Sequence, residues 1–257
     1  MDIIMRYRKI NDINIMEAFK DDGIENKPLI IFYHGATGKK EDGLYPAFNL
    51  ARNGFHVVLP DAVQHGERKQ EGIYLNLFEI ILRTSEEVNK IIDSFSVNSC
   101  VDTTRAGLGG ISMGGLITFK YLTGKDMRIK AAATTIGTPV WVSAITNPLL
   151  ISTFKSINAH YSEEDIKKEQ EIAAQFQPIN DYKSMVGVPL LMQNGESDEI
   201  VQVEGVKDFY NKLLEASDNK EDVKIITYPG VGHTYTAEME AELIAWFKKY
   251  MFIGGSL

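Results

Sequence analysis

Residues 106–116 have the sequence AGLGGISMGGL, and the fold that we expect follows from this stretch. It contains the pattern G-x-S-x-G at residues 110–114. The apolar run before the pattern predicts a buried strand, and residues 116–122 after it predict a helix that Gly124 could end. Strand, sharp turn and helix together are the setting in which this pattern forms a nucleophile elbow, with Ser112 at its tip.

The glycines on either side of Ser112 have a steric role in such a turn. A serine at the tip has a cramped backbone conformation, so Gly110 and Gly114, two residues before and after it, must be nearly free of side chain. The following helix directs its amide groups and the positive end of its dipole toward the place where negative charge would develop. The alternative is a tight turn with no catalytic role.

Length and composition are those of an ordinary globular protein. The chain has 257 residues, 44% hydrophobic and 24% charged. This length fits one large α/β domain or two small ones, and it can bury a sizeable core. The net charge of −8 argues against nucleic acid or an anionic membrane as a partner, because both attract a basic surface. The chain shows no signal peptide and no apolar run long enough to span a membrane, so we expect a cytoplasmic protein. Cys100 is the single cysteine, and we expect no metal and no cofactor.

Strand-like and helix-like segments alternate along the chain, which favours a mostly parallel sheet with helices on both faces. We predict an α/β fold with a central sheet of about eight strands in a single domain, residues 1–253, followed by a tail, residues 254–257. Besides the run before the elbow, the expected strands are residues 2–8, 13–19, 29–33, 56–60, 130–137, 188–193 and 223–228. Besides the helix after the elbow, the expected helices are residues 44–52, 74–95 as one long amphipathic helix, and 237–250.

Residues 140–185 interrupt this alternation, because no strand is predicted there. The first half is apolar and contains Trp141, and the second half has the spacing of a capping box at residues 162–165. We predict a helical lid insertion that roofs the site, with Trp141 as a contact to the substrate. The alternative is that Trp141 and its apolar neighbours fill a core.

Ser112 needs a base and an orienting acid, because a serine hydroxyl is a poor nucleophile at neutral pH. His233, one of five histidines, follows the last predicted strand and therefore lies at the same edge of the sheet as the elbow. Asp198 follows the preceding strand at that edge, and we predict that it orients His233. Glu196 and Glu199 of the same loop are alternatives for the acid.

The loop at residues 33–38, YHGATG, follows another apolar strand at this edge. Its glycines allow the backbone to bend and to approach the elbow closely. We predict that the N–H groups of Ala36 and Met113 form the oxyanion hole, where the negative oxygen of the reaction intermediate is bound. We expect His34 to be a structural residue of this loop.

The loop at residues 61–68, DAVQHGER, follows the next strand and reaches the same edge of the sheet. We expect it to form a wall of the site. The alternative is a direct contact to the substrate by His65 or Arg68.

Five motifs of the chain resemble those of the α/β-hydrolases, and within them the small bacterial esterases of the dienelactone-hydrolase and prolyl-oligopeptidase-like branch. The motifs are HGATG (34–38), D-x-x-x-H-G-x-R (61–68), GISMG (110–114), G-x-x-D-x-x-V (195–201) and GVGH (230–233). The resemblance implies the α/β-hydrolase fold. It also implies the nucleophile, acid and base at Ser112, Asp198 and His233, and the oxyanion amides at Ala36 and Met113.

The chain departs from these relatives in three respects. Dienelactone hydrolase has a cysteine at the elbow, where this chain has Ser112. The oligopeptidases carry a large propeller domain, for which we expect no room here. Many members have a glycine at the position of Gln64.

We therefore expect a serine carboxylic ester hydrolase that acts on small to medium esters, such as acetyl or short-chain acyl esters. It would form an acyl-enzyme on Ser112, which a water activated by His233 then hydrolyses. One alternative is a peptidase or amidase with the same residues, which would need a site for a charged terminus. The other is a non-catalytic ligand-binding protein of the same fold, which would be expected to lack one member of the catalytic set.

Overall fold

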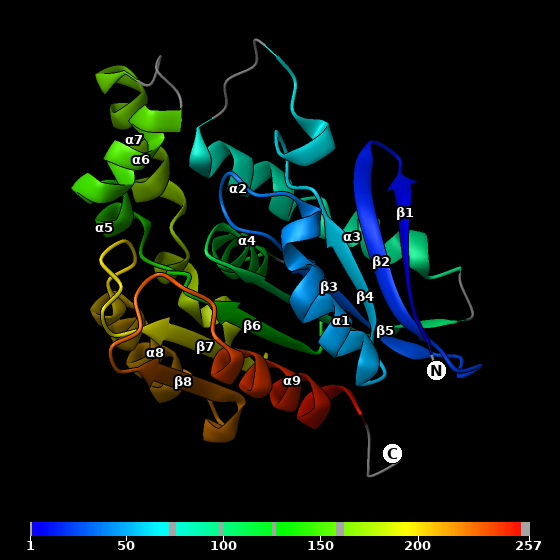
Figure 1. Cartoon of the computed structure of the whole chain (residues 1–257). Coiled ribbons are helices and arrows are strands. Elements are labelled where there is room, and N and C mark those ends of the chain that lie inside the picture. The colour runs from blue at the N-terminus through cyan, green and yellow to red at the C-terminus, as the bar shows by residue number, and fades with distance from the viewer. Residues whose placement is uncertain (1, 72–75, 98–99, 125–126, 158–161, 253–257) are drawn as a thin grey trace.

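An eight-stranded sheet runs through the centre of the structure (Figure 1). The computed structural model describes residues 2–71, 76–97, 100–124, 127–157 and 162–252. The strand order is β1-β2-β4-β3-β5-β6-β7-β8. The first two strands form an antiparallel hairpin, β2 is antiparallel to β4, and the other neighbouring pairs are parallel. The strand bounds are Asp2–Ile10 (β1), Ile13–Asp21 (β2), Lys27–Tyr33 (β3), His56–Pro60 (β4), Val101–Ile111 (β5), Ala131–Thr135 (β6), Leu190–Gly195 (β7) and Val223–Tyr228 (β8).

Helices cover both faces of this sheet (Figure 1). The side chains of β3 show how the two faces divide, since Leu29 and Ile31 belong to one core cluster and Ile30 and Phe32 to the other. Strands that are apolar on both faces are typical of a sheet buried between helices. The α/β fold class and the eight strands predicted from the sequence are confirmed. One face is covered by α1 (Leu44–Arg52) and α9 (Ala237–Met251), and the other by α2 (Leu77–Ser85), α3 (Val88–Phe95), α4 (Met113–Leu122) and α8 (Val203–Ala216).

The prediction of one long helix over residues 74–95 is wrong. The chain forms α2 and α3 with a break at Glu86 and Glu87, and residues 74 and 75 lie outside the described residues. The Ser85 hydroxyl donates to the carbonyl oxygen of Leu82 at 2.7 Å, an interaction that competes with helical bonding. Glu87 binds Arg68 of the neighbouring loop through two N–O distances of 2.7 Å. We attribute the break to these interactions, which periodicity does not reveal.

A helical insertion separates β6 from β7, as the sequence predicts for residues 140–185. Its helices lie together at the upper left of Figure 1, next to α2. Ser162 begins the polar helix of this insertion, and its hydroxyl accepts from the backbone N–H of Asp165 at 3.2 Å. The insertion consists of α5 (Trp141–Ile145), α6 (Pro148–Ile157), α7 (Glu163–Phe176) and the 3-10 segment η3 (Pro178–Met185).

Across the described ranges, no helix has both the length and the apolar character needed to cross a membrane. The predicted tail, residues 254–257, lies outside these ranges. The assignment of residues 1–253 to a single domain stays a prediction.

Candidate active site

Ser112 stands at a sharp turn between β5 and α4. Its φ of +54° and ψ of −112° lie in a region that a residue with a side chain rarely adopts. Such a conformation costs about 1–3 kcal/mol and persists only where the surroundings enforce it. Here its N–H donates to the carbonyl oxygen of Thr135 on β6 at 2.9 Å, and its own carbonyl accepts the first bond of α4, from Leu116 N at 3.1 Å.

The two glycines around Ser112 are sterically required, as the sequence predicts. A Cβ atom at Gly110 would lie 2.5 Å from the carbonyl carbon of Gly114. A Cβ atom at Gly114 would lie 2.2 Å from the carbonyl oxygen of Tyr33. Both distances are shorter than any tolerable contact, so the elbow can close on itself at Gly110 and pack against β3 at Gly114 only without these side chains.

The structure brings Ser112, His233 and Asp198 together. His233 lies in the loop between β8 and α9, and its Nε2 is 2.9 Å from Oγ of Ser112. Its Nδ1 is 2.7 Å from Oδ2 of Asp198. The two distances correspond to a hydroxyl that donates to Nε2 and an Nδ1–H that donates to the carboxylate, which is the arrangement a histidine base requires.

Asp198 is held in one orientation by the backbone of its own loop. Its side chain is fully buried, and Oδ1 accepts from the N–H groups of Ile200 at 2.9 Å and Val201 at 2.8 Å. The alternative acids are placed differently, since Glu196 and Glu199 are both exposed. Glu196 accepts instead from the Thr227 hydroxyl at 2.7 Å. Of the three acids, Asp198 is the one that meets the imidazole.

The loop after β3 lies against the elbow. A Cβ atom at Gly35 would be 3.7 Å from Cβ of Ser112, so the backbone there is in near contact with the serine. Among the described residues, the N–H groups of Ala36 and Met113 have no hydrogen-bond acceptor. An oxyanion hole requires such free N–H groups, and the assignment of Ala36 and Met113 to it stays a prediction.

His34 holds the loop after β3 in place. Its ring is buried, its Nε2 accepts from the N–H of Ala62 at 3.1 Å, and its Nδ1 donates to the carbonyl oxygen of Gly35 at 2.7 Å. Burial lowers the pKa of His34, so the ring is neutral at neutral pH. These contacts agree with the structural role expected from the sequence.

The two residues named as alternative substrate contacts are both engaged by the protein. Nε2 of His65 accepts from the N–H of Thr37 at 3.3 Å, and Nδ1 donates to the carbonyl oxygen of Val63 at 2.9 Å. Arg68 forms the paired contact with Glu87, and its side chain is 9% exposed. His65 therefore joins the two loops that border the elbow, and Arg68 anchors its loop to the break between α2 and α3.

The structure places Trp141 in the core. It is fully buried and stacks on Phe78 of α2, with ring centroids 4.7 Å apart and planes 12° from parallel. This placement corresponds to the alternative that the apolar pattern left open, and it does not present the ring to a substrate.

Asp61 explains the spacing of the motif at residues 61–68. Its buried carboxylate accepts from the N–H of Lys40 at 2.8 Å, from Nζ of Lys40 at 3.0 Å and from the N–H of Glu67 at 3.1 Å. Gly66 has φ of +53°, and a Cβ atom there would lie 2.1 Å from Oδ1 of Asp61. Gln64 also has a positive φ, +58°. Glycine adopts this conformation easily, which gives a physical reason for the glycine of the related esterases.

Two polar residues of the insertion have contacts that were not predicted from the sequence. Asn147, between α5 and α6, donates to the backbone of the loop that carries Asp198. Glu169, on α7, is fully buried and accepts from the backbone N–H groups at the start of α2. Glu169 gives a signal in the sequence, because it lies with Ile166 and Ala173 on the buried face of α7.

In the part of the chain that the structure describes, no three His, Cys, Asp or Glu side chains come together in a way that could hold a metal ion. The hydroxyl of Ser112 contacts the imidazole of His233 instead, and the N–H groups of Met113 and Ala36 belong to the two segments that meet at the elbow. Such a set is suited to nucleophilic attack with proton transfer through His233 and to binding of a negative oxygen.

Comparisons with known proteins agree with this geometry. The sequence profile of the prolyl oligopeptidase family matches residues 50–253, which is more than half of the chain. The candidate esterase YitV of Bacillus subtilis (strain 168) is 31% identical over 233 residues, covering 87% of this chain and 89% of its own. The esterase YjfP of Escherichia coli (strain K12) is 26% identical over 257 residues, covering 95% and 98%.

Solved structures share the fold at low sequence identity. The protein TT1662 of Thermus thermophilus matches with a TM-score of 0.75 at 18% identity, covering 98% of this chain and 99% of its own. The acylaminoacyl peptidase of Pyrococcus horikoshii matches with a TM-score of 0.76 at 18% identity, covering all of this chain and 43% of its own. The fold is therefore that of the α/β-hydrolases, as predicted. With the match over residues 50–253 and the resemblance to YitV, the chain belongs to the prolyl oligopeptidase family of serine hydrolases.

Proposed function

We propose that this protein is a carboxylic ester hydrolase with Ser112 as nucleophile, His233 as base and Asp198 as orienting acid. The observation that carries the proposal is the continuous line of contacts from Ser112 Oγ through the imidazole to the Asp198 carboxylate, at 2.9 and 2.7 Å. The names of the relatives YitV and YjfP support an ester as substrate.

In the first half of the reaction, Oγ of Ser112 attacks the carbonyl carbon of the ester while Nε2 of His233 accepts the hydroxyl proton. The buried carboxylate of Asp198 stabilises the imidazolium that results. The carbonyl oxygen becomes negative and is bound by the N–H groups of Ala36 and Met113. Collapse of this intermediate breaks the bond to the alcohol, which leaves with the proton of His233.

In the second half, a water molecule attacks the acyl-enzyme. His233 accepts one proton of that water and returns it to Oγ of Ser112 when the carboxylic acid leaves. In our proposal the strained conformation of Ser112 serves both halves, because a nucleophile elbow exposes the serine hydroxyl at the end of its strand and uses the N–H of the next residue, here Met113, for the negative oxygen.

We propose small to medium esters, such as acetyl or short-chain acyl esters, as substrates. The insertion at residues 140–185 contacts the loop that carries Asp198 through Asn147, and the side chains of Val142 and Leu149 on it are exposed and apolar. In our proposal it acts as a lid over the acyl group. The partner is then a small ester and neither nucleic acid nor a membrane, in keeping with the net charge of −8. We expect the enzyme to act in the cytoplasm and without a cofactor.

The test is a set of p-nitrophenyl esters graded from acetate to laurate, assayed with wild type and Ser112→Ala together. We expect hydrolysis of the short esters by wild type, and a loss of about 10⁴-fold or more in kcat for Ser112→Ala. The matching p-nitroanilides are measured in parallel. Faster turnover of the anilides would favour a peptidase or amidase, and no turnover of either series would favour a ligand-binding protein.

A further inference from the structure

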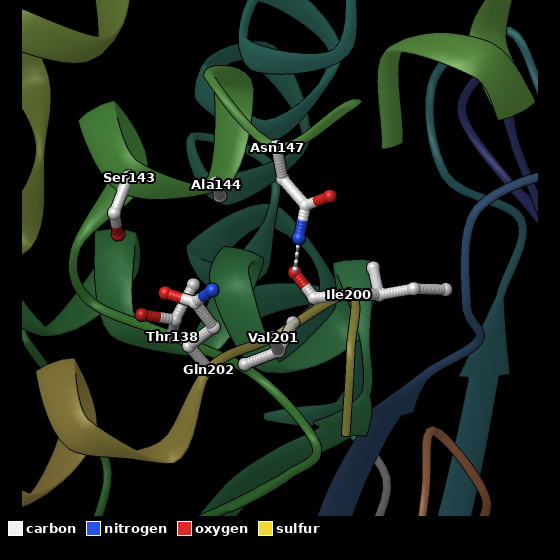
Figure 2. Close-up of a pocket in the computed structure, with 7 residues that line it drawn as sticks. All are labelled: Thr138, Ser143, Ala144, Asn147, Ile200, Val201 and Gln202. Carbon is white, nitrogen blue, oxygen red and sulfur yellow. Dashed lines mark hydrogen bonds between the residues drawn. The ribbon is translucent and has the colours of Figure 1, made fainter. Parts of the chain in front are cut away.

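Asn147 connects the insertion to the loop that carries Asp198. It lies between α5 and α6, and Figure 2 shows its side chain pointing from this turn toward Ile200. The two segments border a pocket of about 10 Å³, which has room for one water molecule (Figure 2).

The polar groups of Asn147 all have partners. Its Nδ2 donates to the carbonyl oxygens of Glu199 at 2.6 Å and Ile200 at 3.2 Å. Its Oδ1 accepts from the N–H of Leu149 at 2.9 Å, which caps the start of α6. The side chain thus has two separate roles. Its carbonyl group caps a helix of the insertion, and its amino group binds the loop that carries Asp198, here called the acid loop.

The two carbonyl groups that Asn147 binds belong to the peptide units that hold Asp198. The carbonyl of Glu199 shares a planar peptide unit with the N–H of Ile200, and the carbonyl of Ile200 shares one with the N–H of Val201. These two N–H groups donate to Oδ1 of Asp198 at 2.9 and 2.8 Å. In a trans peptide the N–H and the carbonyl point in opposite directions. Asn147 and Asp198 therefore bind opposite sides of the same two peptide units.

This arrangement has a consequence for His233. A rigid peptide unit that is fixed at its carbonyl is also fixed at its N–H, so Asn147 limits the rotation that would turn both amides away from Asp198. A hydrogen bond at the carbonyl also polarises the peptide and strengthens the N–H as a donor. Oδ2, the other oxygen of the same carboxylate, binds Nδ1 of His233 at 2.7 Å.

We propose that Asn147 is a positioning residue for the reaction, which acts by fixing the two peptide units that orient Asp198 toward His233. The inference rests on the proposed function, because it assigns Asp198 the role of orienting acid. The proposal predicts that the insertion affects kcat through the acid loop. This effect is separate from any effect of the insertion, as a lid, on substrate binding.

The test separates the two roles of Asn147. Asn147→Ser keeps a capping oxygen for α6 but is too short to reach the carbonyls of Glu199 and Ile200. Asn147→Asp keeps the size and the cap but has no donor. Thermal unfolding shows whether each variant folds, and if one does not, the other is used for the test. The matched control is Ser143→Ala, since Ser143 borders the same pocket but donates to Val140 within its own segment.

We expect both Asn147 variants to lower kcat for p-nitrophenyl acetate by about 10-fold or more, since a displacement of about 1 Å can cost about 100-fold. KM should change by less than about 2-fold, and Ser143→Ala should match wild type. In the background of Asp198→Asn, Asn147→Ser should lower kcat by less than about 2-fold, because the Asp198 carboxylate through which Asn147 acts is already absent. An equal loss in both backgrounds, or wild-type kcat for both Asn147 variants, would overturn the proposal.

A spectroscopic readout makes the inference independent of ester hydrolysis. The Nδ1 proton of His233, in its short bond to Asp198, should give a far-downfield proton resonance in wild type and in Ser143→Ala. We expect this resonance to broaden or move upfield in Asn147→Ser. A wild type that hydrolyses no ester would refute the proposed function alone. An unchanged resonance in Asn147→Ser would refute the role of Asn147 alone.

Discussion

Glu169 should make the free energy of unfolding depend on pH. Its carboxyl group is fully buried on α7, where it accepts from the N–H groups of Leu77 at 2.5 Å and Phe78 at 3.1 Å. Burial raises the pKa of Glu169 from 4.5 to about 7, although the two hydrogen bonds act in the opposite direction. The folded protein therefore binds a proton at Glu169 over a pH range in which the unfolded chain has released it.

The sign and size of the effect follow from these two pKa values. Between pH 4.5 and about pH 7 the folded state binds more protons than the unfolded state. The contribution of Glu169 to stability is therefore largest below pH 4.5, and it is lost as the pH rises through about 7. Integrating the two titrations from about pH 5.5 to about pH 8 gives a loss of about 2 kcal/mol.

Glu169→Gln isolates this contribution, because glutamine keeps the size of the side chain and one acceptor for α2 but does not ionise. Urea unfolding followed by the fluorescence of the two buried tryptophans, Trp141 and Trp246, measures the free energy of unfolding of wild type and variant at both pH values. We expect the variant to gain about 2 kcal/mol relative to wild type between about pH 5.5 and about pH 8. The control is Glu164→Gln on the exposed face of α7, which should show no such change. A difference that is independent of pH would mean that the amides and dipole of α2 cancel the effect of burial on the pKa of Glu169, and a difference of opposite sign would mean that they outweigh it; either result would refute the reasoning.

Three further predictions concern the site and its supports. Asp198→Asn should lower kcat by about 10⁴-fold, whereas Glu196→Gln should stay within about 2-fold, as measured by steady-state hydrolysis of p-nitrophenyl acetate. Gly114→Ala should yield little folded protein, because its Cβ atom would lie 2.2 Å from a backbone oxygen of β3; circular dichroism of the purified variant measures this. Arg68→Met should lower the free energy of unfolding by about 3–5 kcal/mol in urea, because it leaves the carboxylate of Glu87 buried and unpaired.

Each of these predictions has a contrary outcome. A larger loss for Glu196→Gln than for Asp198→Asn would overturn the assignment of the acid. A Gly114→Ala protein with wild-type folding would mean that the elbow has room for a side chain. An Arg68→Met protein as stable as wild type would show that Glu87 finds water or another partner; the double variant Arg68→Met with Glu87→Leu, which removes both charges, is the matched control.

The strands β3, β4, β6 and β7 were predictable because they are short, mainly apolar runs that are buried throughout. Residues 29–33 and 56–60, for example, are buried on both faces of the sheet, so their composition alone distinguishes them from surface helices. The elbow was predictable for a steric reason, since only a turn without side chains at Gly110 and Gly114 lets Ser112 adopt its positive φ.

Other features depend on contacts between residues far apart in the chain. The break at Glu87 depends on an arginine 19 residues away, and the burial of Glu169 depends on amides 91 and 92 residues away. The amphipathic pattern of residues 74–95 continues across the break, because α2 and α3 both pack on the same face of the sheet. Periodicity reports which face is buried, but it does not report where a helix ends.

The sequence places the candidate acids in a single loop, but the spacing of residues alone does not decide which of them orients His233. Asp198, Glu196 and Glu199 all follow the same strand, and any of them would be compatible with its position at the edge of the sheet. What distinguishes Asp198 is the direction of the Ile200 and Val201 amides, which bind its carboxylate and turn it toward His233. That direction is a property of the folded loop, to which Asn147 of the insertion also contributes.

Covalent labelling of the serine tests the central claim most directly. Wild type, Ser112→Ala and His233→Ala are treated with a fluorophosphonate, and the mass of each intact protein is measured, followed by peptide mapping. We predict that one probe per chain attaches to wild type at Ser112, that Ser112→Ala remains unlabelled, and that His233→Ala reacts at least about 100-fold more slowly. Equal labelling of Ser112→Ala, or a folded wild type that does not react, would contradict the assignment of Ser112 and His233.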